Sequence, residues 1–365
     1  MNEKPWLKNI KPYPPGKTLE ELKKELQLDG PIYKLNSNEN PLGPSPKVIS
    51  VLAEALQEIH LYPEASYLSL RTSIAEKWNI SPEEIILGNG SNEVIEFIFK
   101  AYLNPEDEII ISTPSFLMYE KFAEIYGVRV IKIPLDKNLN HDFVAIIDSI
   151  TPKVKAIFID HPHNPTGQVH PKEIWENLLK ALPKEILLVI DEAYGDFIED
   201  PEVPQGIEFF RAGYQVLILR TFSKAFGLAG LRLGYGMGPR EIINTLNKVR
   251  QPFNVNILAV KAGLASLKDR EYAENYVNLV KKERAYLTRA LKELGFKVYP
   301  SQANFLMVDF GKQCSLIYEG LLKRGIILRP LKAYGFPTAL RITIGNEEAN
   351  RVLVENLNWL IKEVN

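Results

Sequence analysis

The sequence predicts an α/β fold: a large domain with a mostly parallel β-sheet flanked by helices, followed by a smaller α+β domain. Short unbroken apolar runs recur between about residues 85 and 255, and amphipathic helical patterns lie between them. This alternation is typical of βαβ units whose strands are buried on both faces. After residue 260 the pattern changes to a long charged helix and two separate strands, which predicts the second domain.

The length and composition fit two globular domains. The chain has 365 residues, 45% of them hydrophobic and 24% charged, and a formal net charge of −1. A chain of this length buries a large core and commonly divides. We expect an N-terminal arm over residues 1–30, a large domain over 31–258 and a small domain over 259–365. The near-zero net charge argues against a nucleic-acid or anionic-membrane partner.

The cysteine content and the N-terminal sequence bear on the compartment. Cys314 is the only cysteine, which excludes an internal disulfide and suits a reducing environment. The first residues contain no apolar stretch of signal-peptide type, and no run approaches the roughly 20 apolar residues that cross a bilayer. We therefore expect a cytoplasmic protein with no membrane partner.

The first elements are a short helix and a strand. Thr18 and Glu21 form a capping-box pattern after a proline-rich start, and this predicts a short amphipathic helix. Residues 81–84 repeat the capping signal, but the apolar run 85–87 follows too soon for a long helix. We expect a brief turn there and then a strand.

The remaining elements follow the same two patterns. In the large domain, further strands are predicted at 109–112, 128–133, 156–159, 186–190 and 216–219. The clearest helical patterns between strands cover 92–103 and 172–182. In the small domain we expect a helix over 270–294, stopped by a glycine, and strands at 305–308 and 340–344.

Two residues directly after apolar strands carry the strongest chemical signal. Lys224 lies just past the strand at 216–219, and Asp191 ends the strand at 186–190. Ligands of parallel sheets usually bind at these carboxyl ends. Taken alone, Lys224 fits a solvated surface charge and Asp191 fits the cap of a turn. Together they predict pyridoxal phosphate, because a desolvated lysine forms a Schiff base with its aldehyde and a carboxylate keeps its ring nitrogen protonated.

A glycine loop supplies a candidate phosphate site. Gly88-Asn-Gly-Ser-Asn-Glu93 follows a strand and opens a helix, whose N-terminal N–H groups are available to a phosphate. A plain strand–helix turn is the alternative. A dinucleotide fingerprint is disfavoured, because Glu93 replaces the third glycine and no strand ending in an acid follows about twenty residues later. Ser223 and Arg232 bracket the lysine and suit the same phosphate through charge-assisted hydrogen bonds.

Three residues fit the faces and edges of a cofactor ring. Phe116 follows a strand and is suited to stack on the ring, a contact worth about 1 kcal/mol beyond burial, although an aromatic residue there is more often part of the core. Asn164 lies in a proline-stiffened loop and is able to donate to a phenolate oxygen. Tyr194, three residues after the aspartate, reaches the same oxygen. Two donors to that oxygen lower the pKa of the cofactor's imine.

An arginine and two histidines leave alternatives open. Arg341 lies inside an apolar strand, where its planar guanidinium fits a substrate carboxylate in two-point fashion; a structural salt bridge is the alternative. His161 and His163 invite a zinc site, but no cysteine or Glu-x-x-His pattern accompanies them, and we expect no metal. Both histidines also fit a role in lining the loop or an interface.

Four motifs in order resemble the fold-type I pyridoxal-phosphate aminotransferases, and the resemblance covers nearly the whole chain. They are Asn-Pro-Thr-Gly at 164–167, Asp-Glu-Ala-Tyr at 191–194, Ser-Lys-x-x-Gly-x-x-Gly-x-Arg at 223–232 and Arg-Ile-Thr-Ile-Gly at 341–345. Within this family the chain is most similar to the branch that acts on histidinol phosphate. The segments that carry this finer resemblance are 11–17, 35–43, 60–64, 251–256 and 325–330.

The resemblance implies a role for each matching position. Lys224 would form the Schiff base, Asp191 would meet the pyridine nitrogen, and Phe116 would stack on the ring. Asn164 and Tyr194 would bind the ring oxygen. The phosphate would be held by Ser91, Asn92, Ser223 and Arg232, and the substrate pocket would be lined by Tyr13, Asn40, Arg329 and Arg341.

The resemblance also implies a homodimer, in which Tyr62 would reach the phosphate bound by the neighbouring subunit. The chain departs from the family pattern at two places. Phe116 stands where a tyrosine is common, so stacking is kept but a hydrogen bond from that ring is lost. His161 and His163 stand where asparagines are common.

The implied reaction converts L-histidinol phosphate and 2-oxoglutarate to imidazole-acetol phosphate and L-glutamate, and runs in reverse in histidine biosynthesis. Aromatic amino-acid aminotransferases and threonine-phosphate decarboxylases use nearly the same framework and remain alternatives. A non-catalytic sensor domain would need an attached DNA-binding segment, and the N-terminal region has neither a helix-turn-helix nor a basic patch. A dehydrogenase built on the Gly88 loop is a third alternative.

Overall fold

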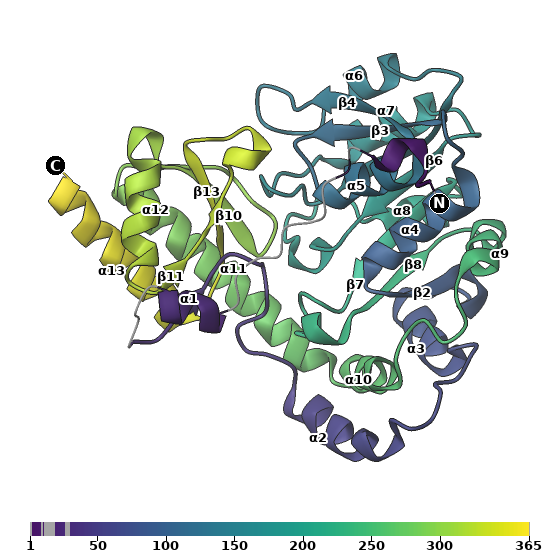
Figure 1. The fold of residues 1–365 in the computed structure, drawn as a ribbon, viewed down its shortest axis with the longest axis horizontal. Coiled ribbons are helices and arrows are strands. Elements are labelled where there is room, and N and C mark those ends of the chain that lie inside the picture. Colours follow the sequence, from purple (N-terminus) through teal and green to yellow (C-terminus); the bar gives the residue numbers. More distant parts are fainter. Residues whose placement is uncertain (1, 9, 11–18, 26–29, 365) are drawn as a thin grey trace.

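The computed structural model describes residues 2–8, 10, 19–25 and 30–364, which form two lobes (Figure 1). The larger lobe contains a seven-stranded sheet and the smaller lobe a four-stranded one. Helix α11 (Arg270–Glu293) runs between the lobes and contributes side chains to the core of each.

The seven-stranded sheet is mostly parallel. Only β8 is antiparallel to both of its neighbours, and the other adjacent strands pair in parallel. In spatial order the strands are β2 (Ile85–Asn89), β8 (Leu233–Met237), β7 (Val216–Thr221), β6 (Leu187–Asp191), β5 (Val154–Asp160), β3 (Glu108–Thr113) and β4 (Arg129–Pro134).

Helices cover both faces of this sheet, because successive strand residues point to opposite sides. In β5, for example, Ile157 belongs to one core cluster and Phe158 to the other. One face packs against α4 (Ser91–Tyr102), α5 (Leu117–Tyr126) and α9 (Arg240–Val249). The other packs against α2 (Pro46–Ala55), α3 (Leu68–Trp78), α6 (Phe143–Asp148), α7 (Lys172–Ala181), α8 (Gly206–Arg211) and α10 (Ile257–Lys268).

The smaller lobe combines an antiparallel sheet with helices. Its strands, in spatial order, are β12 (Arg329–Pro330), β13 (Ala339–Thr343), β10 (Phe305–Asp309) and β9 (Lys297–Val298). Helices α12 (Cys314–Leu322) and α13 (Glu347–Val364) pack with α11 on the core of this lobe, and α1 (Leu19–Glu25) precedes it in sequence. Strand β1 (Tyr33–Lys34) pairs in parallel with β11 (Ile326–Ile327), so a segment near the N-terminus belongs to the C-terminal lobe.

The structure confirms the predicted fold class and each strand predicted from an apolar run. The brief turn at Pro82–Glu84 is also present, with both hydrogen bonds of the Ser81 capping box. Strand β8 was not predicted, because Leu-Gly-Tyr-Gly-Met lacks the β-branched residues that mark strands. Gly234 is needed there, since a Cβ atom would clash with the backbone N of Ser91.

The packing of α10 favours a domain boundary later in the chain than the expected one at residue 258. Helix α10 packs against α2 and α3, and its apolar side chains belong to the core of the larger lobe. We therefore propose a boundary near residue 269, just before α11. Across the described part of the chain, we find no helix with both the length and the hydropathy of a membrane span.

Candidate functional site

A cavity of about 400 Å³ lies at the carboxyl ends of strands β2, β3, β5, β6 and β7. The loops that leave these strands bring together side chains that are far apart in sequence. Every cofactor residue proposed from the sequence, other than Tyr62, lines this cavity: Ser91, Asn92, Phe116, Asn164, Asp191, Tyr194, Ser223, Lys224 and Arg232.

Lys224 presents an amine whose proton is easily lost. Its Nζ donates to the carbonyl oxygen of Ser37 at 3.2 Å and lies 5.6 Å from the centre of the Tyr194 ring. Burial is the main cause that lowers the pKa of this amine to about 8, and the nearby guanidinium of Arg341 lowers it further. About a tenth of the lysine is therefore neutral at pH 7, compared with well under one part in a thousand for an ordinary lysine.

Asp191 presents a buried carboxylate at the end of β6. Burial raises its pKa to about 7, and the charge of Asp160 raises it as well. Two donors oppose this rise: the hydroxyl of Tyr119 at 2.9 Å from Oδ2, and the backbone N–H of Ala193 at 3.1 Å from Oδ1. A carboxylate held in this state gains strongly from a cation placed beside it, such as a protonated ring nitrogen.

A glycine turn and an arginine form a cradle for an anion. Gly90 adopts a φ of +78°, and a Cβ atom there would clash with the guanidinium of Arg232. The turn leads directly into α4, whose first residue is Ser91, so free N–H groups of a 12-residue helix face the cavity. Arg232 Nη1 donates to Ala229 O at 3.0 Å and lies 3.5 Å from Ser223 Oγ. This geometry fits a phosphate group.

Asn164 and Tyr194 are held in defined orientations. Arg341 Nη1 donates to Asn164 Oδ1 at 2.7 Å, and because a guanidinium only donates, the Nδ2 group of this asparagine is the atom left to donate elsewhere. The hydroxyl of Tyr194 accepts from Asn38 Nδ2 at 3.0 Å and keeps its own proton for another acceptor. Burial raises the pKa of Tyr194, so this residue is a neutral donor at pH 7.

Arg341 is buried next to Arg329, its partner across the β12–β13 pair. Its Nη2 donates to Asn36 O at 2.8 Å, while its buried Nε has no hydrogen-bond partner in the described part of the chain. Among the ion pairs of the described residues, neither arginine has a carboxylate partner. The salt-bridge alternative for Arg341 therefore has no support, and an anion from outside the chain would satisfy it.

Among the described residues, four of the predicted substrate or cofactor residues do not line the cavity: Asn40, Tyr62, Arg329 and Arg341. Asn40 is buried, and its Nδ2 donates to Ala225 O at 3.2 Å while its Oδ1 accepts from Leu42 N at 2.9 Å. Tyr62 is 80% exposed and stacks on Phe253 with ring centres 4.7 Å apart. Tyr13 lies outside the residues that the structure describes.

Asp160 and Tyr119 are among the residues of the site that the sequence analysis did not single out. Asp160 ends β5 as Asp191 ends β6, and the two are neighbours in the parallel register. The signal that selected Asp191, an acid after a buried strand, applies equally to Asp160. Tyr119 lies one helical turn after Phe116, so its contact with Asp191 depends on where α5 begins, which the sequence did not reveal.

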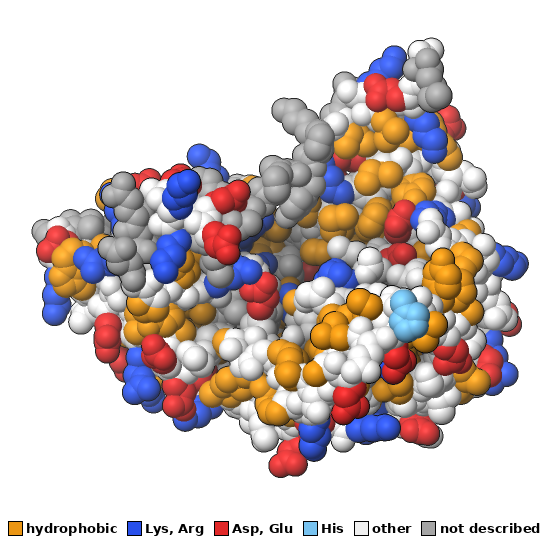
Figure 2. Space-filling view, turned by 60° about the horizontal axis from the view of Figure 1, so that its bottom comes forward, with side chains coloured by type: hydrophobic (Ala, Val, Ile, Leu, Met, Phe, Trp, Pro, Cys, Tyr) orange, Lys and Arg blue, Asp and Glu red, His pale blue; other side chains and the backbone are white. Residues whose placement is uncertain are grey.

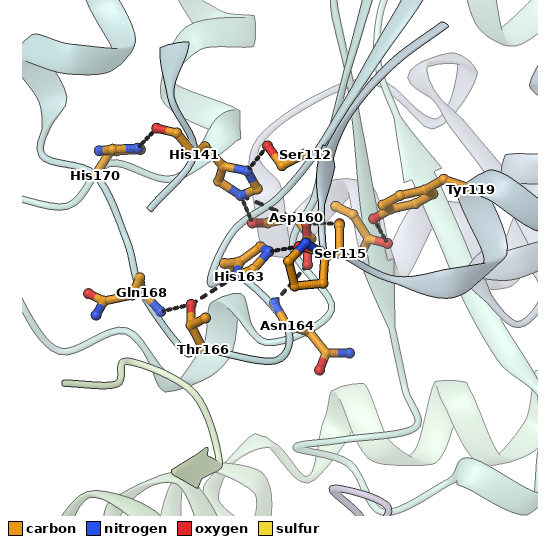
Figure 3. A network of polar contacts seen from close by, with 12 residues as sticks. Ser112, Ser115, Tyr119, His141, Asp160, His163, Asn164, Thr166, Gln168 and His170 are labelled. Carbon is orange, nitrogen blue, oxygen red and sulfur yellow. Dashed lines mark hydrogen bonds and ion pairs between the residues drawn. The ribbon is translucent and has the colours of Figure 1, made fainter. Parts of the chain in front are cut away.

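Buried histidines form a hydrogen-bond network beside the cavity (Figure 3). Ligand atoms of His141, Asp160 and His163 lie within 4.8 Å of one another, as in a metal site. Both imidazole nitrogens of His141 and both of His163 nevertheless already have a protein hydrogen-bond partner, at distances of 2.6 to 2.9 Å. We therefore interpret the cluster as a network and not as a metal centre. His161 packs edge-on against Trp175, and burial lowers its pKa to about 3.

Comparison with known proteins gives consistent results. Residues 31–357 match the family described as aminotransferase class I and II. The chain is 41% identical to the histidinol-phosphate aminotransferase of Moorella thermoacetica, covering 97% of this chain and 91% of that protein. It is 42% identical to the one from Desulfotalea psychrophila, covering 98% and 95%.

Solved structures share the fold. The histidinol-phosphate aminotransferase of Clostridium acetobutylicum superposes with a TM-score of 0.83 at 30% identity, covering 90% of this chain and 99% of that one. The enzyme from Sinorhizobium meliloti, in complex with pyridoxal-5'-phosphate, has a TM-score of 0.89 at 24% identity, covering 99% and 98%. On these matches, which extend over nearly its whole length, the chain belongs to the class I and II aminotransferase family.

Proposed function

We propose that this chain is a pyridoxal-phosphate-dependent aminotransferase that acts on L-histidinol phosphate and 2-oxoglutarate, and that it runs in reverse in histidine biosynthesis. One observation carries the proposal: a lysine amine and a buried aspartate line the same cavity, beside a phosphate cradle and two arginines. The names of the relatives support the choice of substrate, and the cofactor in the Sinorhizobium meliloti enzyme supports the choice of cofactor.

The cavity residues fit pyridoxal phosphate at five separate points. When bound, this cofactor supplies an aldehyde carbon that reacts with amines and a ring that withdraws electrons from the substrate. Lys224 would bind the aldehyde carbon, and Asp191 would hold a proton on the ring nitrogen. Phe116 would lie against the ring, while Asn164 Nδ2 and the Tyr194 hydroxyl would donate to its oxygen. Gly90 supports the fit at the phosphate, because a Cβ atom at this position would displace Arg232, the proposed phosphate ligand.

Lys224 is suited to move the proton of the reaction. An amine with a pKa of about 8 is neutral often enough to take a proton from the substrate Cα, and basic enough to hold it until it is returned. Its hydrogen bond to Ser37 O keeps Nζ on one side of the cavity. This placement favours transfer of the proton on a single face of the substrate.

Arg341 and Arg329 would bind the acidic end of each substrate. The two guanidinium groups occupy neighbouring strands, and Asn164 holds one of them in a fixed direction. A phosphate and a γ-carboxylate are both oxyanions that such a pair is able to bind. We propose that Asn40 acts indirectly, by holding the Ala225 carbonyl next to the lysine, and that Tyr13 belongs to the same pocket.

The test is amine transfer by the purified holoprotein and by Lys224→Ala. We expect the substitution to lower kcat by about 10³-fold or more, because it removes the group that carries the proton. Lys77→Ala is a matched control, since Lys77 is also largely buried but does not line the cavity. Near-normal turnover by Lys224→Ala would rule out the proposed role.

Substrate choice is tested by offering histidinol phosphate, phenylalanine, tyrosine and threonine phosphate with 2-oxoglutarate as acceptor. We expect kcat/KM to be highest for histidinol phosphate. A strong preference for phenylalanine would favour an aromatic aminotransferase, and release of carbon dioxide from threonine phosphate would favour a decarboxylase. The absorbance spectrum of the purified protein separates all of these from a nicotinamide enzyme.

We propose that two copies of the chain form a dimer in which Tyr62 completes the partner's site. Hydrophobic side chains gather on the face of the molecule shown in Figure 2. Burial of such a patch against a second copy would remove a large apolar area from water. Exposed large hydrophobic residues are frequent between residues 42 and 68, namely Leu42, Ile49, Leu56, Ile59, Leu61, Tyr62 and Leu68, and Phe253, which stacks on Tyr62, is exposed as well.

We also propose a cytoplasmic location. Cys314 is buried, and burial raises the pKa of its thiol to about 11, so this residue is protected from oxidation and has no second cysteine as a partner. Localisation of a tagged copy in cells would test the proposal.

A further inference from the structure

Asp160 connects two loops that approach the cofactor cavity from different strands. Its Oδ1 accepts from the hydroxyl of Ser115 at 2.6 Å, and its Oδ2 accepts from the backbone N–H of Asn164 at 2.7 Å (Figure 3). Ser115 immediately precedes Phe116, the proposed stacking residue. One buried carboxylate therefore contacts the loop that carries the ring-stacking group and the loop that carries the donor to the ring oxygen.

His163 makes a second connection between the same loops. Its Nε2 lies 2.9 Å from the carbonyl oxygen of Pro114, and its Nδ1 lies 2.8 Å from Thr166 Oγ1. Because a carbonyl only accepts, Nε2 carries the proton and Nδ1 accepts from the threonine hydroxyl. The loop of residues 113–116 is thus bound to the loop of residues 161–167 twice, once through Asp160 and once directly by His163.

His141 fixes the backbone of Asp160. By the same argument, its Nε2 donates to the Asp160 carbonyl at 2.8 Å, and its Nδ1 accepts from Ser112 Oγ at 2.6 Å. Burial and the neighbouring His163 lower the pKa of His141 well below its usual range, so the ring is neutral. Its Nε2 lies 3.8 Å from Asp160 Oδ1, but a neutral ring does not neutralise the carboxylate.

We propose that Asp160 is a positioning residue of the cofactor cavity, whose two carboxylate oxygens hold the Phe116 loop and the Asn164 loop in one fixed arrangement. The inference rests on the cofactor site proposed above. A buried carboxylate costs several kcal/mol unless hydrogen bonds compensate it. Here both compensating donors belong to these loops, so the loops are held in the arrangement in which the carboxylate is satisfied.

The test compares Asp160→Asn with Asp160→Ala in the full-length protein. The asparagine retains both links, because its oxygen is able to accept from Asn164 N–H and its amide nitrogen is able to donate to Ser115 Oγ. We expect Asp160→Ala to raise the Kd for pyridoxal phosphate about tenfold, because both hydrogen bonds are lost, and Asp160→Asn to raise it less than about threefold, because both are kept without the charge. The visible circular dichroism band of the bound cofactor should change in the alanine variant and be retained in the asparagine variant.

Ser115→Ala removes one link and is the second variant, in case Asp160→Ala does not fold. We expect this substitution to raise the Kd for pyridoxal phosphate about threefold and to alter the circular dichroism band of the bound cofactor. Glu108→Ala is the matched control. Glu108 is also buried and accepts from a hydroxyl, that of Thr151, at 2.6 Å, but it lies at the opposite end of the sheet. It should lower the Tm without changing the Kd or the band.

Several outcomes would overturn the inference. Wild-type Kd and an unchanged band in Asp160→Ala or in Ser115→Ala would show that the links do not position the cofactor. Equal weakening by the asparagine and alanine variants would show that charge, and not hydrogen bonding, is the important property. Failure of the unmodified protein to bind pyridoxal phosphate would overturn the cofactor site as well, so the two failures are distinguishable.

Discussion

Asp191 couples the site to the stability of the protein. Its usual pKa of 3.8 rises to about 7 in the folded chain, mainly because it is buried. Between these values the folded state binds a proton that the unfolded state has released. Stability contributed by this proton is therefore present below about pH 4 and is lost as the pH rises towards 7.

Asp191→Asn should remove this pH-dependent loss. We expect the cofactor-free variant to exceed the cofactor-free wild type in free energy of unfolding by on the order of 2–4 kcal/mol at pH 7.5, with a smaller difference at pH 5. Urea unfolding at several pH values measures this difference. A difference that does not change with pH would contradict the prediction. The same variant should bind pyridoxal phosphate more weakly, since an amide does not offset the charge of the ring nitrogen.

Sequence alone selected residues by their position after a strand, and the structure brings these residues to one cavity. Lys224 and Asp191 were found because each follows a buried apolar run. Asp160 carries the same signal, but no role was assigned to it, because the histidines and Asn164 that follow it gave a more specific motif. The contact of Arg341 with Asn164 joins residues 177 positions apart, and no local pattern encodes it.

At the scale of single elements, the start of α4 depends on one glycine. Gly90 has a φ of +78°, and its missing Cβ leaves space for the guanidinium of Arg232. Gly90→Ala should displace that arginine and raise the Kd for pyridoxal phosphate tenfold or more, because charge-assisted hydrogen bonds to the phosphate would be lost. Equilibrium titration with the cofactor measures this change.

Gly213→Ala provides the control for backbone strain. Gly213 has a φ of +90°, but no atom lies within 4 Å of its ideal Cβ position. Both variants should lose about 1–2 kcal/mol of stability from the left-handed conformation. Only the Gly90 variant should lose cofactor affinity, and equal loss in both would mean that the cradle does not depend on this close approach.

The strands differ in how far the sequence revealed them. Buried parallel strands such as β5 and β6 are continuous apolar runs and were predicted within two residues. Strand β8 was missed because its glycines serve the packing of α4 and conceal the strand pattern. The two-residue strands β1 and β11 were missed because they are too short for any periodicity and pair across the length of the chain.

At the scale of the whole molecule, subunit mixing tests the proposed dimer. Lys224→Ala and Tyr62→Ala should each be weakly active alone. If Tyr62 serves the partner's cavity, mixed dimers contain one intact site, and equal amounts should recover about a quarter of wild-type activity. If Tyr62 serves its own subunit, mixing restores nothing.

Mixing Lys224→Ala with Asp191→Ala is the control, because both residues line the cavity of one chain. No mixed dimer of these two variants contains an intact site, so activity should stay low. Analytical ultracentrifugation of each mixture establishes that dimers are present. Recovery in this control would show that the chains exchange more than the Tyr62 segment.

The pairing of β1 with β11 determines which parts of the chain are able to fold first during synthesis on the ribosome. Tyr33 meets Ile326, which is synthesised 293 residues later (326 − 33), whereas the seven-stranded sheet is complete once residue 237 has emerged. Domains generally fold as units during synthesis. We therefore expect the seven-stranded sheet to form first, while β1 remains unpaired until β11 has been synthesised. The carbonyl of Ser37 that receives the Lys224 amine follows β1 directly. We therefore expect a nascent chain to form its sheet before Ser37 is in place to hold Lys224, the proposed Schiff-base lysine, and to bind the cofactor only after β11 has been synthesised.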